Sequence, residues 1–218
     1  MHEFVEWPKT KRLFRDIVIT EKLDGTNSGI HISAVTDPDE LWVFPENSYT
    51  VIVGGVRYVV TAQSRKRIIT PGKTTDNFGF AGWVYDNAVD LVSILGEGLH
   101  FGEWYGQGIQ RGYGLDEKRF ALFNTARWRE VDDSGTSPEL RALDSGVGAQ
   151  VDAVPVIYEG PFDQGYIRTA LWNLREHGSW AAPGFMNPEG VCVYHSQSRN
   201  VFKVTLDNQD AGKWEVAA

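Results

Sequence analysis

Alternating apolar and polar residues dominate the start of the chain. In residues 16–21 the apolar side chains of Ile17 and Ile19 stand two positions apart, and residues 29–35 repeat this pattern. An alternation with a period of two is typical of a strand that buries one face. We therefore expect two strands here, joined by the stretch 21–27, EKLDGTN.

Four later stretches also predict strands. Residues 50–60, TVIVGGVRYVV, have the pattern of a hairpin that turns at two glycines. Residues 119–128 and residues 151–160 each have the apolar content of one strand. Residues 190–206 contain two apolar runs on either side of SQSRN, a pattern that favours a last hairpin.

Two stretches have the period of amphipathic helices. Residues 80–95 place six apolar side chains on one face: Phe80, Val84, Ala88, Leu91, Val92 and Leu95. Residues 163–178 begin at Asp163, a residue type that caps helices, and end at Gly178. The apolar stripe of this second helix consists of Ile167, Leu171 and Leu174.

This order of elements predicts an α+β fold, in which helices pack outside antiparallel sheets, rather than a βαβ alternation. The polar, glycine-rich residues 132–148 are interpreted as a surface excursion with one short helix. We expect residues 1–218 to form one domain. Neither standard glycine-rich phosphate loop, GxxxxGK[ST] or GxGxxG, occurs in the sequence.

Composition and charge set limits on the function. Hydrophobic residues make up 42% and charged residues 23% of the 218, which is ordinary for a soluble globular protein. The net charge of -8 argues against a large non-specific nucleic-acid footprint. A single cysteine excludes an internal disulfide, and no apolar run approaches the ~20 residues of a membrane helix. We expect a cytoplasmic monomer that has no membrane partner.

Lys22 is either a nucleophile or an ordinary surface lysine in a turn. A free lysine amine, with a pKa of about 10.4, is almost fully protonated at neutral pH. It attacks only where burial or nearby positive charge favours its neutral form. Attack on a carbonyl would need a carbonyl pocket, which the sequence does not identify. Attack on a nucleotide phosphate would need acidic residues for a metal, cations for phosphates and an aromatic ring for the base.

All three kinds of residue occur further along the chain. Glu103 lies in HFGEWYG, interpreted as a turn-like, aromatic setting, and Glu189 comes just before an apolar run. Lys203 lies on the expected partner strand of that run, and Phe123 could stack on a base. Each residue alone also has a structural explanation, because turns contain glutamates before glycine and solvated strand faces contain lysines.

The order of six motifs resembles the covalent nucleotidyltransferase superfamily of ligases and capping enzymes. These motifs are KLDGTN, SRKR, FGEW, FALFNT, EGV and FKVT, and they span most of the chain. They are most similar to the ATP-dependent RNA ligase branch. DNA ligases of the superfamily usually carry arginine at the position of Asn27, whereas the similar RNA ligases carry asparagine. Capping enzymes share the KxDG core but use GTP.

The resemblance implies a fold in which antiparallel sheets form a nucleotide cleft with flanking helices. It also implies that Lys22 attacks the α-phosphorus of ATP and carries AMP, with Asp24 and Glu189 holding Mg²⁺ or Mn²⁺. By the same resemblance, Lys203 binds the phosphate and stabilises the charge that develops there. Lys22, Asp24, Glu189 and Lys203 would thus be the catalytic residues.

Further roles carried over from the family concern nucleotide binding. Asn27 would bind the α-phosphate, Arg65 and Glu103 the ribose hydroxyls, and Phe123 would stack on the adenine. The backbone at Glu21 would read the adenine edge. The AMP would pass to a 5′-phosphate of RNA, and a 3′-hydroxyl would then join the two ends and release AMP.

Two departures from the family pattern leave alternatives open. The last motif commonly has two lysines in the pattern K-x-K, but the second position is Thr205 here, so that either Lys203 has to do more or another cation, such as Lys213 or Lys9, substitutes. Only residues 207–218 follow the last motif, and we expect no C-terminal accessory domain. The alternatives are an adenylyltransferase acting on DNA ends or only on pre-adenylated ends, or a non-catalytic nucleotide-binding module.

Overall fold

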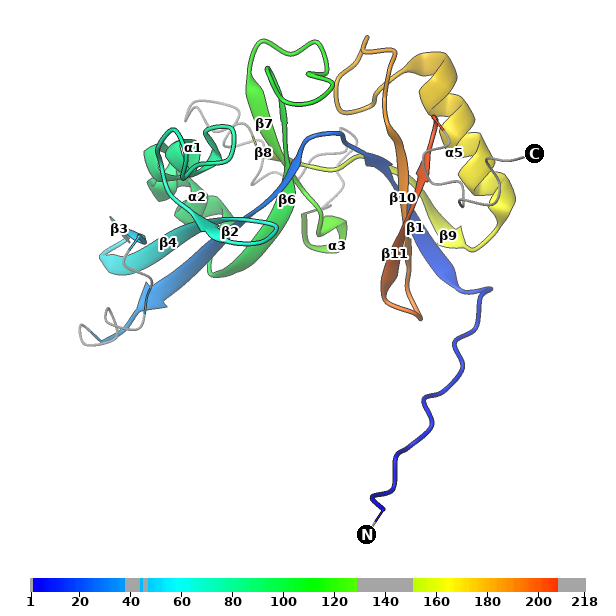
Figure 1. The fold of residues 1–218 in the computed structure, drawn as a ribbon, viewed down its shortest axis with the longest axis horizontal. Coiled ribbons are helices and arrows are strands. Elements are labelled where there is room, and N and C mark those ends of the chain that lie inside the picture. Colours follow the sequence, from blue (N-terminus) through cyan, green and yellow to red (C-terminus); the bar gives the residue numbers. More distant parts are fainter. Residues whose placement is uncertain (1, 38–43, 45–46, 129–150, 208–218) are drawn as a thin grey trace. The chain divides into compact units, whose positions relative to one another are not determined.

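The computed structural model describes residues 2–37, 44, 47–128 and 151–207 (Figure 1). The chain forms two compact units. Unit 2 consists of residues 23–154, and unit 1 contains the chain up to Lys22 and again from Pro155 onwards. The predicted surface excursion at 132–148 and Lys213 lie outside the described residues.

Unit 1 is a four-stranded antiparallel sheet with one helix against it. Its strands are ordered β11–β10–β1–β9. Their bounds are Asp16–Lys22 for β1, Val156–Pro161 for β9, Gly190–His195 for β10 and Asn200–Thr205 for β11. The N-terminal strand β1 thus lies between two strands from the C-terminal part of the chain, as Figure 1 shows.

Helix α5, Gln164–His177, covers one face of this sheet and forms the core of unit 1. The buried side chains of that core are Ile17, Ile19, Ala170, Leu174, Val191 and Val193. The Asp163 carboxylate accepts a hydrogen bond from the N–H of Gly165, and Gly178 follows the last turn with a φ of 82°. The predicted start and end of this helix are confirmed.

Unit 2 contains a larger sheet with strands in the order β3–β4–β2–β6–β7–β8, and β5 also pairs with β4. All pairs are antiparallel except β7 with β8. The bounds are Thr26–Val35 for β2, Tyr49–Val53 for β3, Val56–Ser64 for β4, Ile68–Ile69 for β5, Gly98–Gly106 for β6, Lys118–Leu122 for β7 and Val151–Ala153 for β8. The predicted α+β class with mostly antiparallel sheets is confirmed.

Helices α1, Phe80–Asp86, and α2, Ala88–Leu95, pack on one face of this sheet. The six apolar side chains predicted to share a face between residues 80 and 95 are all buried in the core of unit 2. The sequence predicted one helix, but the chain breaks at Asn87, whose N–H donates to the carbonyl of Trp83. Both helices keep the same buried face on either side of the break.

Two strand predictions are wrong in part. Residues 119–128 contain all of β7 except its first residue and then a short helix, α3, Thr125–Trp128. Residues 151–160 contain β8 and β9, which belong to different units, because the chain leaves unit 2 at Val154. Within the described ranges, no helix combines the length and hydrophobicity needed to cross a membrane.

Gly190 allows β10 and β11 to pair closely beside Lys22. It lies opposite Lys22 on β1 and opposite Thr205 on β11. Its φ is 151°, and a Cβ atom there would lie 2.2 Å from the carbonyl oxygen of Val204. A side chain at this position would therefore push β11 away from β10.

We expect Gly190→Ala to lower the free energy of unfolding by at least about 3 kcal/mol, because it adds a clash to an unfavourable backbone angle. Gly184→Ala is the matched control. Gly184 also has a positive φ, 92°, but a Cβ atom added there would meet no atom within 4 Å. This control should cost only about 1–2 kcal/mol. Urea denaturation measures both, and equal losses would contradict the steric explanation.

Candidate active site

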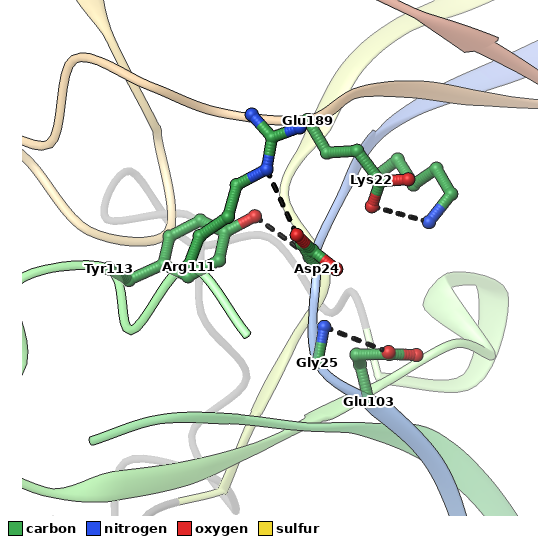
Figure 2. A network of polar contacts seen from close by, with 7 residues as sticks. All are labelled: Lys22, Asp24, Gly25, Glu103, Arg111, Tyr113 and Glu189. Carbon is green, nitrogen blue, oxygen red and sulfur yellow. Dashed lines mark hydrogen bonds and ion pairs between the residues drawn. The ribbon is translucent and has the colours of Figure 1, made fainter. Parts of the chain in front are cut away.

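Lys22 is the last residue of β1 and its side chain leaves the sheet on the face opposite α5. Ile17 and Ile19 point toward the helix, and the period of two places Lys22 on the other side. The Lys22 Nζ donates a hydrogen bond of 2.6 Å to the Glu189 Oε2, as Figure 2 shows. Both side chains are partly buried, and the Glu189 carbonyl accepts from the N–H of Leu206. The structure thus brings together two residues that the sequence separates by 167 positions.

Strand register places Lys203 and Thr205 on the same face as Lys22. Lys203 pairs with Cys192, which pairs in turn with Thr20, two positions before Lys22. Residues directly opposite one another in antiparallel strands share a face. Lys203 is exposed there, whereas Thr205 is buried, with 4% of its surface accessible. Lys203 is therefore the cation that this end of β11 offers to a ligand.

Glu21 points to the other face of β1 and fixes a loop there. Its carboxylate is buried, and its Oε2 accepts hydrogen bonds from the N–H groups of Trp180 and Ala181, at 2.8 Å and 3.0 Å. The Oε1 is buried and has no hydrogen-bond partner among the described residues. Burial raises the pKa of Glu21, while the nearby Ser179 hydroxyl and the two N–H groups act in the opposite direction.

The backbone of Glu21 is also engaged, because its N–H donates to the carbonyl of Pro155. This N–H is therefore not available to a nucleotide. The role of the Glu21 backbone at the adenine edge stays a prediction.

In unit 2, Asp24 is held at two points by the loop that follows β6. The Arg111 Nε donates to the Asp24 Oδ2 at 2.9 Å, and the Asp24 N–H donates to the Tyr113 hydroxyl at 2.8 Å (Figure 2). Both members of the ion pair are partly buried. Asp24 was predicted to hold a metal, and in the structure its carboxylate has a cationic partner.

Gly25 allows the chain to pass close to β6. A Cβ atom at this position would lie 2.4 Å from the Trp104 carbonyl oxygen, so this turn requires a glycine. The Gly25 N–H donates to the Glu103 Oε1 at 3.2 Å. Glu103 was interpreted as a turn residue, which is wrong, because it lies within β6.

Asn27 and Glu103 are direct neighbours on the sheet of unit 2. They form a cross-strand pair between β2 and β6. Ile30 and Ile32 face the helices α1 and α2, so the alternation places Asn27 on the opposite face. This face lies opposite the helices and carries two of the predicted nucleotide-binding residues side by side.

The aromatic and basic residues predicted for the nucleotide have different settings. Phe123 follows β7 directly, and its N–H donates to the carbonyl of Phe101, which extends the pairing by one residue. Its side chain is 40% exposed, so the ring is accessible to a ligand. Arg65 lies in the exposed turn between β4 and β5, which the Ser64 N–H closes by donating to the carbonyl of Arg67.

Sequence reasoning missed Arg111, Tyr113 and the side-chain role of Glu21. Arg111 and Tyr113 lie in GQGIQRGYG, residues 106–114, where four glycines have positive φ angles. The density of glycines was the available signal for a tightly folded loop. The sequence did not reveal which residue the loop contacts, because Asp24 lies 87 positions before Arg111.

Asp24 in unit 2 and Glu189 in unit 1 each have, taken separately, the chemistry of a ligand to a hard divalent cation. Carboxylate oxygens such as those of Asp24 and Glu189 suit Mg²⁺ or Mn²⁺, which usually take one or two carboxylates together with waters and phosphates. The described residues contain no group of three or more His, Cys, Asp or Glu side chains arranged as a metal cage. Such a cage is not needed for a cation that also binds a nucleotide.

The raised pKa of Glu21 predicts a pH-dependent stability. A carboxyl whose folded pKa lies above its unfolded value of 4.5 takes up a proton on folding between these two values. The contribution of this carboxyl to the free energy of unfolding is fully present below pH 4.5 and is lost as the pH rises through the folded pKa. We therefore expect the stability of the wild type relative to Glu21→Gln to fall as the pH rises from 4.5 through the folded pKa of Glu21.

Chemical denaturation at several pH values measures this difference. Glu176→Gln, a change at an exposed glutamate of α5, is the control for the loss of one charge and should give a difference nearly independent of pH. A Glu21→Gln difference that is constant or rises with pH would contradict the role of burial.

Comparison with known proteins identifies the family. The sequence profile of the RNA ligase family matches residues 15–205, which span both units. None of the curated proteins compared with the sequence matches it.

Three solved structures of Naegleria gruberi RNA ligase mutants are similar in fold. An apo mutant has 15% identity and a TM-score of 0.51, and covers 88% of this chain and 50% of its own. A mutant with ATP and Mn has 14% identity and a TM-score of 0.51, covering 88% of this chain and 49% of its own. Another mutant with ATP and Mn has 14% identity and a TM-score of 0.50, covering 91% of this chain and 53% of its own. The chain thus spans about half the length of these ligases. Because the family profile covers most of the sequence, this protein belongs to the RNA ligase family.

Proposed function

We propose that this protein is an ATP-dependent RNA ligase in which residues 1–218 act as one adenylyltransferase domain. The Lys22 Nζ loses a proton and forms a bond to the α-phosphorus of ATP, and the bond to the pyrophosphate oxygen breaks. The resulting lysyl-AMP passes its AMP to a 5′-phosphate of RNA. A 3′-hydroxyl then attacks that phosphate and releases AMP. The contact of 2.6 Å between Lys22 and Glu189, in a chain of this family, is the observation that carries the proposal.

Within unit 1, residues on the sheet face opposite α5 would act in successive steps. The Lys22 amine is occupied by its contact with Glu189, since its Nζ donates to the Glu189 Oε2 at 2.6 Å. Lys22 must therefore separate from Glu189 before it attacks. Lys203, exposed on the same face, would bind the phosphate and stabilise the charge that develops on it.

Within unit 2, the proposal concerns the face opposite α1 and α2. Asn27 would donate to the α-phosphate, and its neighbour Glu103 would accept hydrogen bonds from ribose hydroxyls. Phe123 would stack on the adenine, which its 40% exposure permits. Arg65, in an exposed turn, would contact the ribose as well.

Asp24 and Glu189 would hold Mg²⁺ or Mn²⁺. When bound, the cation would neutralise charge on the α-phosphate and compete with Lys22 for the Glu189 carboxylate. ATP together with Mn occurs in the N. gruberi ligase mutants of similar fold.

Labelling tests the first step. We expect the protein to retain label after denaturation when it is incubated with MgCl₂ or MnCl₂ and ATP labelled at the α-phosphate. Lys22→Ala should lose all label, because the nucleophile is gone, and Lys73→Ala, a change at an exposed lysine, should retain it. An unlabelled wild type would exclude the proposed function, and preferential labelling by GTP would favour capping chemistry.

A joining assay with the labelled protein then shows which nucleic-acid ends accept the AMP. Nicked duplexes and single strands of RNA and DNA are offered, each with a 5′-phosphate or with a preformed adenylated end. Joining of 5′-phosphorylated RNA is the expected result. Joining of DNA without RNA would remove the RNA assignment, and joining of adenylated ends alone would remove the second step. A labelled protein that joins nothing would leave only self-adenylylation.

Phe123 offers a test of base recognition. We expect Phe123→Ala to raise the KM for ATP by roughly 5- to 150-fold, the effect of losing one base–aromatic stack, in the labelling assay. Phe101→Ala is the matched control, because Phe101 is an equally exposed ring beside it, at 41% against 40%. Equal effects of the two changes would argue against a specific stack on Phe123.

A further inference from the structure

The loop after β6 has a fixed structure around the Asp24 turn. Its backbone closes on itself, since Gln107 donates to the Glu117 carbonyl and Ile109 to that of Gly106. Ile109 is completely buried in the core of unit 2. The loop is therefore anchored at both ends and in its middle, and it presents Arg111 and Tyr113 from a rigid base.

Tyr113 is held as firmly as the loop that carries it. Its side chain is only 2% exposed and packs edge-to-face against Tyr105, with ring centroids 5.4 Å apart. Its hydroxyl is thus fixed where it accepts the Asp24 N–H at 2.8 Å. Because the tyrosine cannot move freely, the backbone at Asp24 is held as well.

Arg111 acts on the side chain of the same residue. Its Nε lies 2.9 Å from the Asp24 Oδ2, an ion pair that compensates the carboxylate and selects one orientation of it. Glu103 holds the next residue through the Gly25 N–H. Three side chains from β6 and its loop therefore hold the Asp24–Gly25 turn, as Figure 2 shows, and Asp24 is two residues from Lys22 in the chain.

We propose that Arg111 and Tyr113 are positioning residues for the transfer of AMP to Lys22. Arg111 orients the Asp24 carboxylate, and Tyr113 fixes the backbone of the Asp24–Gly25 turn. This inference rests on the proposed function, because it assigns a role in the same adenylylation step. Neither residue needs to touch the nucleotide.

The kinetic test measures lysyl-AMP formation in single turnovers with the full chain and MnCl₂. Arg111→Ala should lower the rate at saturating ATP by about 10- to 100-fold, as loss of a residue that supports a metal ligand does. The KM for ATP should stay within about threefold, because Arg111 orients Asp24 rather than binding ATP. Arg111→Lys should restore only part of the rate, since lysine lacks the planar guanidinium.

Tyr113→Phe should lower the same rate by roughly fivefold, the effect of one neutral hydrogen bond. Arg119→Ala is the matched control, because Arg119 is also partly buried and paired, with Glu117 at 2.7 Å. This control should keep the wild-type rate. A raised KM with an unchanged saturated rate in Arg111→Ala would mean that Arg111 binds ATP directly, and would overturn the positioning role.

A second measurement does not depend on activity. Hydrogen exchange of the Asp24 amide should be faster in Tyr113→Phe than in the wild type or Arg119→Ala, because the acceptor is lost. Wild-type exchange in Tyr113→Phe would overturn the inference even if labelling succeeds. If the wild type takes no label, the proposed function fails, and with it the catalytic part of the inference, while exchange still decides whether Tyr113 holds the turn.

Discussion

The alternation of side chains along β1 is the constraint on which the candidate site depends. Adjacent residues of a strand point to opposite faces, so Glu21 and Lys22 cannot share an environment. Glu21 is buried and accepts hydrogen bonds from the N–H groups of Trp180 and Ala181, and Lys22 emerges on the other face beside Glu189. Because the buried carboxylate fixes the register of β1, a shift by one residue would exchange the two side chains. The orientation of Lys22 therefore follows from the burial of its neighbour.

The stretch EKLDG makes physical sense residue by residue. Leu23, the first residue of unit 2, is buried, with 3% of its surface exposed. Asp24 is paired with Arg111, and Gly25 has no room for a Cβ atom beside Trp104. Each position thus meets a separate demand of burial, charge or space. The residues of this turn are therefore constrained by their surroundings, unlike those of an ordinary surface turn that contains a lysine.

The sequence predicted those features that local physics determines. Periodicity found the buried faces of β1, α1, α2 and α5, and the helix α5 has the predicted cap and end. Periodicity failed where the chain changes direction within an apolar run. At Val154, for example, the single strand that was predicted is in fact two strands. It also missed Arg111, because an ion pair between residues 87 positions apart leaves no local pattern. Only the resemblance to a family implied that Lys22 and Glu189 belong to one site, and their direct contact was not predicted.

Charge compensation links the stability of the free protein to the proposed chemistry. The carboxylates proposed to hold a metal each have an internal cation, Lys22 for Glu189 and Arg111 for Asp24. A partly buried carboxylate without a partner is costly, so these cations stabilise the fold when no nucleotide is bound. In the proposed reaction the two pairs are not equivalent, because Lys22 would have to leave Glu189 to act as a nucleophile, whereas Arg111 would stay near Asp24. In the proposed mechanism the contact between Lys22 and Glu189 would therefore have to break before the attack, so that Glu189 would control the first step as well as bind the metal.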